Sequence, residues 1–355
     1  MIEIDGSYGE GGGQILRTSV SLSALTLKPV RITKIRAGRP QPGLKRQHLA
    51  GIELVAQLVN AETKGLEVGS TQIEFIPTDL QSGDFEYDIG TAGAISLVLQ
   101  AVLPPAILSQ EPVRFRIKGG TDVSWSPPVD YLSEVFVPMI AQMGPKIEIH
   151  QNKRGHYPRG GGSVSVEVHP TSEISTITLV DFGEIASVTG VSHCVRLPDH
   201  VADRQASAAE YEIENKELNL EPIRREWYPK SNDPHLGAGS GIVLWAESKS
   251  GIRIGATGLG ERGKRAEQVG KEAAQYLLQE LATKRAVDKH LSDMLIPYLA
   301  LANGESKIGV TEITSHLVTN IWVAKKVLGA EIEVQGNIGE PGIASVRGIG
   351  FSLLE

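Results

Sequence analysis

A glycine-rich segment near the N-terminus carries residue types that bind phosphate. Residues 5–17 read Asp-Gly-Ser-Tyr-Gly-Glu-Gly-Gly-Gly-Gln-Ile-Leu-Arg and lead into a predicted helix. The amide groups at a helix N-terminus attract anions. A bound anion would also explain Arg17, because the helix dipole disfavours a cation at this end. Glu10 is placed to hold a divalent metal that bridges phosphates. The residues alone leave open an ordinary exposed arginine and a glutamate in a turn.

A second basic segment, residues 36–48, passes from the end of a predicted strand through a rigid loop into a predicted helix. Its four cations are Arg36, Arg39, Lys45 and Arg46. Cations gathered beside a helix N-terminus suit phosphate groups better than they suit a generic surface. The segment is therefore a candidate phosphate contact.

His316 is one of several candidate nucleophiles among the nine histidines. Thr314 and Ser315 offer an N-cap, which places His316 in the first turn of a helix beside free backbone N–H groups. We expect that position to keep the imidazole neutral, and hence nucleophilic, and to stabilise a phosphate attached to the ring.

Residues 258–264, Gly-Leu-Gly-Glu-Arg-Gly-Lys, fit the pattern G-x-G-x-x-G and most of the phosphate-loop pattern. The next residue, Arg265, stands where a phosphate loop needs a serine or threonine for magnesium. An acid at the distance typical of a dinucleotide fold does not follow. We therefore predict an ordinary connection from strand to helix that binds no nucleotide.

The distribution of charge is more informative than the net charge of −7. Residues 11–52 contain no Asp or Glu, and their basic residues are Arg17, Lys28, Arg31, Lys34, Arg36, Arg39, Lys45 and Arg46. This asymmetry indicates an anionic ligand held by one region, although each of these residues taken alone is better explained by a solvated face.

Composition places the chain among soluble globular proteins. It has 355 residues, of which 41% are hydrophobic and 22% charged, so disorder is excluded as the main state. Cys194 is the only cysteine, which excludes an intrachain disulfide and favours a reducing compartment. Residues 1–6 carry acids where a signal peptide would be basic, and apolar runs stay below the ~18 residues of a membrane span. We predict a cytoplasmic protein without membrane contact.

An internal repeat organises the elements that must position these residues. Helical patterns over 13–26 and 93–108 precede alternating segments at 29–38 and 112–120, which predict strands. Each strand is followed by a proline-bearing loop and a further predicted helix, at 48–60 and 129–143. A third copy comprises a helix over 287–301, a strand over 304–310 and a helix over 316–328 that ends at Gly329. Within the first helix, Leu16 and Val20 lie on the predicted buried face, whereas Gln14, Arg17 and Ser21 lie on the other.

The segment between the second and third copies differs in character. Predicted strands at 187–196 and 241–246 flank a charged helix over 203–219, and a second helix covers 264–283. We predict an α/β (α+β) fold with a large domain of three repeated helix-strand units, 1–181 and 284–355. A smaller α/β domain, 182–283, is inserted between repeats two and three.

Taken together, these segments resemble the RNA 3'-terminal phosphate cyclase family. Residues 154–164, Arg-Gly-His-Tyr-Pro-Arg-Gly-Gly-Gly-Ser-Val, are similar to its signature of Arg-Gly, two variable residues, Pro, one variable residue and three glycines before an aliphatic residue. The segments 5–17, 36–48, 119–122 and 315–317 match as well. The resemblance covers essentially the whole chain.

The resemblance implies a ligase that forms a phosphoric ester bond, using ATP and a divalent metal, Mg or Mn, to convert an RNA 3'-phosphate into a 2',3'-cyclic phosphodiester. His316 matches the nucleophile that attacks the α-phosphate of ATP, which gives a histidine-AMP intermediate and pyrophosphate. AMP then moves to the RNA 3'-phosphate, and the 2'-OH expels it. This is covalent catalysis in activated steps.

The resemblance also implies roles for other residues. Glu10 would bind the metal, and Asp293 would contact the ribose. Pro127 and Tyr131 would enclose the adenine. Phosphates of ATP or RNA would be bound by Arg17, Arg36, Arg39, Gln47 and His48. The nucleotide site would further include Gln100, His290, Leu291, Ser292 and Met294. His290 stands where we would expect an aromatic residue such as tyrosine.

Three other classes of protein are alternatives to the cyclase. A non-catalytic, cyclase-like RNA-binding and processing factor of ribosome assembly would share the scaffold but lack the nucleophile, and Ser315-His316 argues against it. An enolpyruvyl transferase has related repeats but no reason for a histidine at this helix start. A lysine-adenylating ligase would need a Lys-x-Asp-Gly motif, whereas Glu3-Ile4 precedes Asp5-Gly6.

Overall fold

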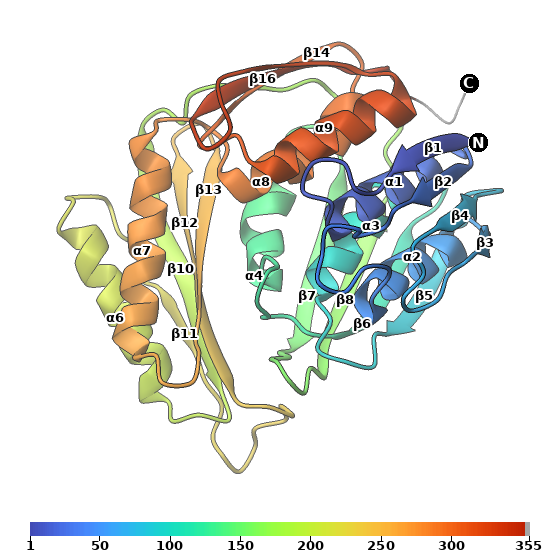
Figure 1. The fold of residues 1–355 in the computed structure, drawn as a ribbon. Coiled ribbons are helices and arrows are strands. Elements are labelled where there is room, and N and C mark those ends of the chain that lie inside the picture. The colour runs from blue at the N-terminus through green and yellow to red at the C-terminus, as the bar shows by residue number, and fades with distance from the viewer. Residues whose placement is uncertain (352–355) are drawn as a thin grey trace.

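The computed structural model describes residues 1–351, and Figure 1 shows their arrangement. Within these residues the strands form four sheets of four strands each, with helices packed on them. The predicted mixed α/β class is confirmed. In the described residues, no helix combines the length and apolar character needed to cross a membrane.

Three of the sheets share one topology, which confirms the repeat. If the four strands of a repeat are numbered along the chain, they lie across the sheet in the order first, second, fourth, third. The first and second strands pair in parallel, and the other two neighbouring pairs are antiparallel. Their strands are β1 (Ile2–Asp5), β2 (Val30–Thr33), β4 (Ile73–Ile76) and β3 (Glu62–Lys64); β5 (Gly83–Asp88), β6 (Val113–Gly119), β8 (Gly162–His169) and β7 (Lys146–Lys153); β9 (Thr178–Leu179), β14 (Glu305–Val310), β16 (Gly342–Arg347) and β15 (Glu331–Gln335).

Each repeat places one helix between its first and second strands and another between its second and third. The first set is α1 (Gly13–Thr26), α3 (Ile95–Ala106) and α8 (Lys289–Leu301). The second set is α2 (Arg46–Leu58), the continuous run α4 (Val129–Tyr131), η1 (Leu132–Phe136) and α5 (Val137–Ala141), and α9 (Ser315–Leu328). The predicted helix over 129–143 thus contains a π-helical segment, a wider turn that is frequent at functional sites.

The fourth sheet belongs to the inserted segment and lies on one side of the molecule, where it contacts the second repeat (Figure 1). Its strands are β11 (Arg224–Glu226), β10 (Ile185–Val195), β12 (Gly239–Ser248) and β13 (Arg253–Leu259), covered by α6 (His200–Glu214) and α7 (Ala266–Ala282). The chain leaves the third repeat after β9 and returns at α8, so the insertion interrupts that repeat instead of preceding all of it. The sequence pattern did not predict this interruption, because β9 has only two residues and shows no strand pattern. The domain limits 182 and 283 stay a prediction.

Helix α1 lies at the centre of the repeats. It packs against α2, α3 and α9, and Leu16 and Val20 are buried as predicted. Because helices surround α1, its polar face is also largely enclosed, and both Gln14 and Ser21 are buried. Polar groups are therefore held inside the molecule, where they need partners or a ligand.

Several element boundaries differ from the sequence pattern by a few residues, and two of the differences have clear local reasons. Strand β2 ends at Thr33, well short of residue 38, because Lys34 and Arg36 adopt left-handed backbone angles with φ of 50° and 53°. Helix α6 begins three residues before the predicted start because the Asp199 side chain accepts a hydrogen bond from the backbone of His200 at 2.8 Å.

Candidate active site

The start of α9 presents His316 next to the glycine-rich loop. Thr314 caps the helix as predicted, its hydroxyl accepting a hydrogen bond from the Leu317 amide at 3.0 Å. The Nδ1 atom of His316 lies 2.9 Å from Oε2 of Glu10, and the imidazole is half-exposed. Because Nδ1 faces the carboxylate, Nε2 is the nitrogen left for reaction with a ligand.

Contact with Glu10 corrects one expectation about this histidine. We predicted that the helix N-terminus would keep the ring neutral, but the contact with the Glu10 carboxylate raises the pKa of His316 despite partial burial. The same contact lowers the pKa of Glu10. The carboxylate therefore favours the protonated ring, and the ring becomes a better nucleophile when another cation compensates Glu10.

The loop after β2 brings Arg39 to the same carboxylate. The Arg39 guanidinium contacts Glu10, which thus lies between an arginine and a histidine. Arg36 instead stabilises the loop, because its Nη1 donates hydrogen bonds to the carbonyls of Gln41 and Gly43 at 2.7 and 3.0 Å. Its predicted phosphate contact would have to use the other guanidinium nitrogens.

Gly13, the first residue of α1, lies close to the side chains of His48 and Arg17. A Cβ atom at Gly13 would lie 2.6 Å from His48 Nε2 and 3.2 Å from Arg17 Nη1, so only glycine allows this approach. Burial, with a contribution from Arg17, lowers the pKa of His48 to about 3, so the ring is neutral. The preceding Gly12 has no side chain to cap the helix, which leaves its first amides available to an anion. Gln47 lies beside His48 on α2 and is partly buried.

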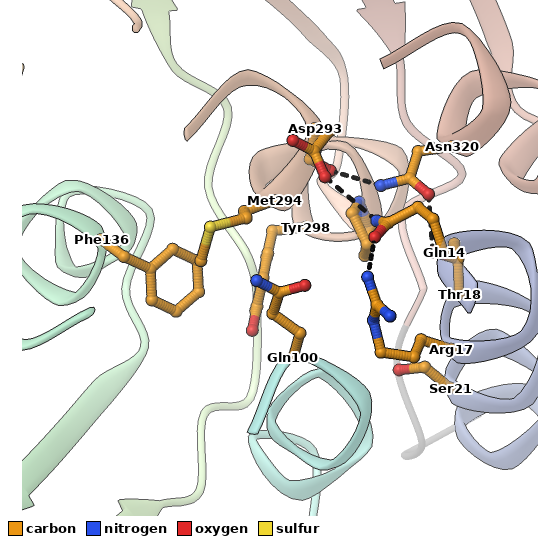
Figure 2. A pocket seen from close by; sticks show the side chains of 11 residues that line it. Gln14, Arg17, Thr18, Ser21, Gln100, Phe136, Asp293, Met294, Tyr298 and Asn320 are labelled. Atoms are coloured by element: carbon orange, nitrogen blue, oxygen red, sulfur yellow. Dashed lines mark hydrogen bonds between the residues drawn. The ribbon is translucent and has the colours of Figure 1, made fainter. Parts of the chain in front are cut away.

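Polar side chains of α1, α8 and α9 surround a small cavity that Arg17 also lines (Figure 2). Gln14 donates a hydrogen bond to Asp293 Oδ2 at 3.0 Å and accepts one from Arg17. Asn320 donates to the Asp293 carbonyl at 2.8 Å and accepts from the Thr18 hydroxyl at 2.6 Å. The network thus connects the polar face of α1 to the predicted ribose contact.

Burial perturbs both charged groups of this network. It raises the pKa of Asp293 to about 7 and lowers the pKa of Arg17 to about 10. The Arg17 side chain makes its hydrogen bond to the neutral amide of Gln14, not to a carboxylate. A desolvated guanidinium held in this way attracts an anion more strongly than a solvated one does.

The cavity itself is too small for a nucleotide. Its free volume is about 20 Å³, roughly the space of one water molecule. Gln100, Met294 and Phe136 close it on the side away from Arg17 (Figure 2). Four of the predicted ligand contacts therefore share one lining, namely Arg17, Gln100, Asp293 and Met294. A nucleoside at this place requires these side chains to move apart.

The start of α8 is organised by Asp288, which sequence reasoning missed. Its carboxylate caps the helix by accepting from the amides of His290 and Leu291, and it also accepts from the Tyr131 hydroxyl at 2.7 Å. His290 is exposed, and its ring meets the edge of Tyr131 with centroids 6.3 Å apart. An aspartate before a helical pattern is a capping signal that could have been recognised.

The remaining predicted adenine and nucleotide contacts are less accessible. Tyr131, Leu291 and Ser292 have no exposed surface, whereas Pro127 is partly exposed. The Ser292 hydroxyl donates to the Lys289 carbonyl within the helix. In this arrangement Tyr131 supports His290 and offers no face of its own to a ligand.

Gln14 and Asn320 are further residues that the sequence interpretation did not assign. Gln14 shares the helical face of Arg17, and Asn320 lies one turn after His316, at the spacing that places two side chains on the same helical face. Helical periodicity already placed Gln14 on the face of Arg17 without giving it a role, and the same spacing counted from His316 would have identified Asn320.

Comparisons with known proteins agree with the resemblance. A family model described as RNA 3'-terminal phosphate cyclase matches residues 8–334. The chain is 54% identical over 348 residues to the RNA 3'-terminal phosphate cyclase of Methanopyrus kandleri, covering 98% of this chain and 99% of that relative. The corresponding protein of Ignicoccus hospitalis is 52% identical over 350 residues, with 98% and 99% covered. A solved enolpyruvyl transferase, NikO from Streptomyces tendae, matches with a TM-score of 0.43 and 9% identity over 98% of this chain and 48% of its own.

Proposed function

The chain belongs to the RNA 3'-terminal phosphate cyclase family and is a cyclase by class, and from that premise we propose a mechanism that uses ATP and a histidine-AMP intermediate. The substrate is an RNA with a 3'-phosphate end, and the product is a 2',3'-cyclic phosphodiester. The observation that supports the proposal most directly is the contact of Glu10 with Nδ1 of the half-exposed His316, which leaves Nε2 free of that carboxylate, while Arg39 contacts the same Glu10.

In the first step, Nε2 of His316 forms a bond to the α-phosphorus of ATP as the bond to pyrophosphate breaks. An oxygen of the RNA 3'-phosphate then attacks the same phosphorus and releases the histidine. In the last step the vicinal 2'-OH attacks the 3'-phosphorus, AMP leaves and the cycle closes. Each step breaks a bond to a good leaving group, whereas direct dehydration would not.

The cationic and amide groups around His316 fit the phosphates of these intermediates. Arg17, Arg39 and the uncapped start of α1 surround the place where negative charge develops. Neutral His48 and Gln47 add hydrogen-bonding groups without further charge. The acidic remainder of the chain should repel bulk nucleic acid, so binding should be directed to the RNA end.

A divalent metal fits Glu10, because its buried Oε2 faces His316 Nδ1 at 2.9 Å, and a cation could replace the proton that the two groups share. Bound there, Mg or Mn would neutralise phosphate charge and favour the departure of pyrophosphate. The chain itself supplies the Glu10 carboxylate. This carboxylate interacts either with such a cation or with the protonated Nδ1 of His316.

The proposal is tested with a synthetic RNA that ends in a 3'-phosphate. Incubation with the protein, ATP and a divalent metal should convert the end into a form that resists phosphatase, with release of AMP and pyrophosphate. Omission of ATP should leave the end sensitive. A resistant end formed without ATP, or none formed with it, would contradict the proposed use of ATP. A non-catalytic RNA-binding factor would leave the end unchanged under both conditions.

Arg39→Ala should slow enzyme adenylylation by about 10- to 100-fold, the effect of losing one hydrogen bond between charged groups. The residue lies in a loop and is partly exposed, so the unfolding temperature should stay near that of the wild type. The measurement is the rate of covalent labelling by ATP labelled at the α-phosphate. Arg204→Ala, which removes an exposed arginine paired with Glu267, is the matched control and should label normally. If Arg39→Ala labels at the wild-type rate, the basic segment does not contact the phosphates of ATP and is an ordinary solvated surface.

Lys264→Ala should leave the same labelling rate within about twofold. The segment 258–264 does connect β13 to α7, and Lys264 Nζ lies 2.5 Å from Glu272 Oε2 on the helix that follows. Such a partly exposed ion pair contributes at most about 1 kcal/mol to stability. A collapse of labelling in a folded Lys264→Ala protein would instead assign the phosphates of ATP to this loop.

A further inference from the structure

Two residues of the segment that resembles the family signature, Arg154 and His156, belong to a buried cluster that does not include His316. Arg154, which is 2% exposed, donates hydrogen bonds to Asp130 at 2.7 Å and to Glu226 at 2.7 and 3.1 Å. It also lies 3.4 Å from Asp122. Glu226 belongs to the inserted sheet, so this cluster lies where the insertion meets the second repeat.

Three side chains in this cluster have the donor atoms and spacing of a metal site. Asp122, His156 and His193 are all buried, and one ligand atom from each lies within 4.8 Å of those from the other two. His193 Nε2 is 3.6 Å from Asp122 Oδ1. Donor atoms around a tetrahedral zinc, at bond lengths of about 2.0–2.1 Å, lie about 3.3 Å apart. A small inward shift would thus bring all three onto one ion.

The histidine nitrogens supply an independent observation. Both ring nitrogens of His193, and Nε2 of His156, are buried and lack hydrogen-bond partners in the part of the chain that the structure describes. The 3.6 Å separation from Asp122 is too long for a hydrogen bond. Leaving such groups unsatisfied in a protein interior is costly, and a metal would satisfy one nitrogen of each ring.

The charges of the cluster also favour a cation. Among the described residues, the carboxylates of Asp122, Asp130 and Glu226 surround the single guanidinium of Arg154. Burial raises the pKa of Asp130, yet the negative surplus remains even when Asp130 is neutral. A buried surplus charge is strongly unfavourable unless a partner compensates it.

The surroundings hold two of the ligands in orientation. The Thr121 hydroxyl donates to Asp122 Oδ2 at 2.6 Å and accepts from the Gly155 amide at 2.8 Å, an arrangement that fixes a metal-binding carboxylate. Strand β12 begins at Gly239 against the imidazole of His156, where a Cβ would lie 2.0 Å from Cγ. The inserted sheet therefore contacts His156 by backbone and contributes His193 from β10.

We propose that Asp122, His156 and His193 bind a divalent transition metal of the zinc class that fastens the inserted sheet to the second repeat. Two imidazoles and one carboxylate form the donor set that zinc prefers over magnesium. The site is distinct from Glu10 in residues and in ligand chemistry. Its burial indicates a structural ion, with the fourth position filled by a small ligand such as water.

The test measures zinc in untagged protein by mass spectrometry after dialysis against a weak chelator. The wild type should retain about one zinc per chain, the stoichiometry of a single site. His193→Gln, which keeps a polar side chain of similar size, should reduce this at least tenfold. His150→Gln, at an exposed position on β7, and Glu10→Gln should both retain the ion. Retention in Glu10→Gln separates this metal from the metal proposed for ATP.

A second measurement does not depend on folding of a variant. Metal-free wild-type protein loaded with cobalt(II) should develop the visible absorption of a four-coordinate nitrogen and oxygen site, and one equivalent of zinc should abolish it. Wild-type protein that binds neither ion after dialysis, or a folded His193→Gln protein that keeps a full equivalent, would overturn the proposal. Metal bound below stoichiometry and removed by dialysis would be adventitious and would overturn it as well.

Discussion

His316→Ala should abolish covalent labelling of the protein by ATP that carries a label at the α-phosphate. We expect a loss of at least about 1,000-fold, because removal of an attacking nucleophile leaves only the slow background of the remaining site. The label on the wild type should be labile in acid and stable in base, as a phosphoramidate is. Denaturing electrophoresis followed by acid and base treatment measures both properties.

The matched control is His200→Ala, which removes an exposed histidine at the start of α6. That variant should label like the wild type. Label accepted by His316→Ala, or label that maps to a lysine, would contradict the histidine intermediate. Conversion of the RNA end by a His316→Ala protein that takes no label would indicate a cyclase without a covalent enzyme intermediate.

An RNA that ends in a 3'-phosphate on a 2'-deoxy sugar should accept AMP and then accumulate as the adenylated strand. The group that attacks in the last step belongs to the RNA, and the deoxy end lacks it. With a terminal ribose, the 2'-OH stands beside the phosphorus at an effective concentration of roughly 10⁵ M or more. The adenylated ribose end should therefore be too short-lived to detect. Gel separation of adenylated, cyclic and starting strands measures the difference.

An RNA with a 3'-OH is the control for this experiment, because it offers no phosphate to receive AMP and should remain unchanged. Equal accumulation of adenylated product from the deoxy and ribose ends would mean that the protein transfers AMP but does not promote cyclisation. The covalent step would then stand, and only the final step of the proposed function would fail.

The sequence pattern predicted the helices and the repeat well because these depend on local periodicity. Helix α1 has the predicted limits, and α9 ends at Gly329, whose φ of 74° favours glycine. The first strand of each repeat was not predicted, because β1 and β9 have only four and two residues and β5 has no buried residue to mark a core face. Such short strands are defined by their partners across the sheet and not by their own pattern.

The chemistry of the candidate site was less predictable than its residues. The helix start indicated a neutral His316, but the ring's state depends on Glu10, which lies far away in sequence. Likewise, Tyr131 was predicted to contact a ligand, and the fold buries it against Asp288. Pairings of this kind arise from tertiary packing, so composition and spacing carry no signal for them.

The interruption of the third repeat has a consequence for the order of folding. Strand β9 pairs with β14, yet the whole inserted segment is synthesised between them. Closing so long a loop is slow when the intervening chain is unfolded. Asp181 and Arg285 form a β-bridge, so the two ends of the insertion lie side by side. Once the inserted sheet has formed, its two ends are close together, and α8 then lies near the elements it packs against, α9 and β14. We therefore expect the first two repeats and the insertion to fold while the ribosome still holds the C-terminal part, with the third sheet assembling last.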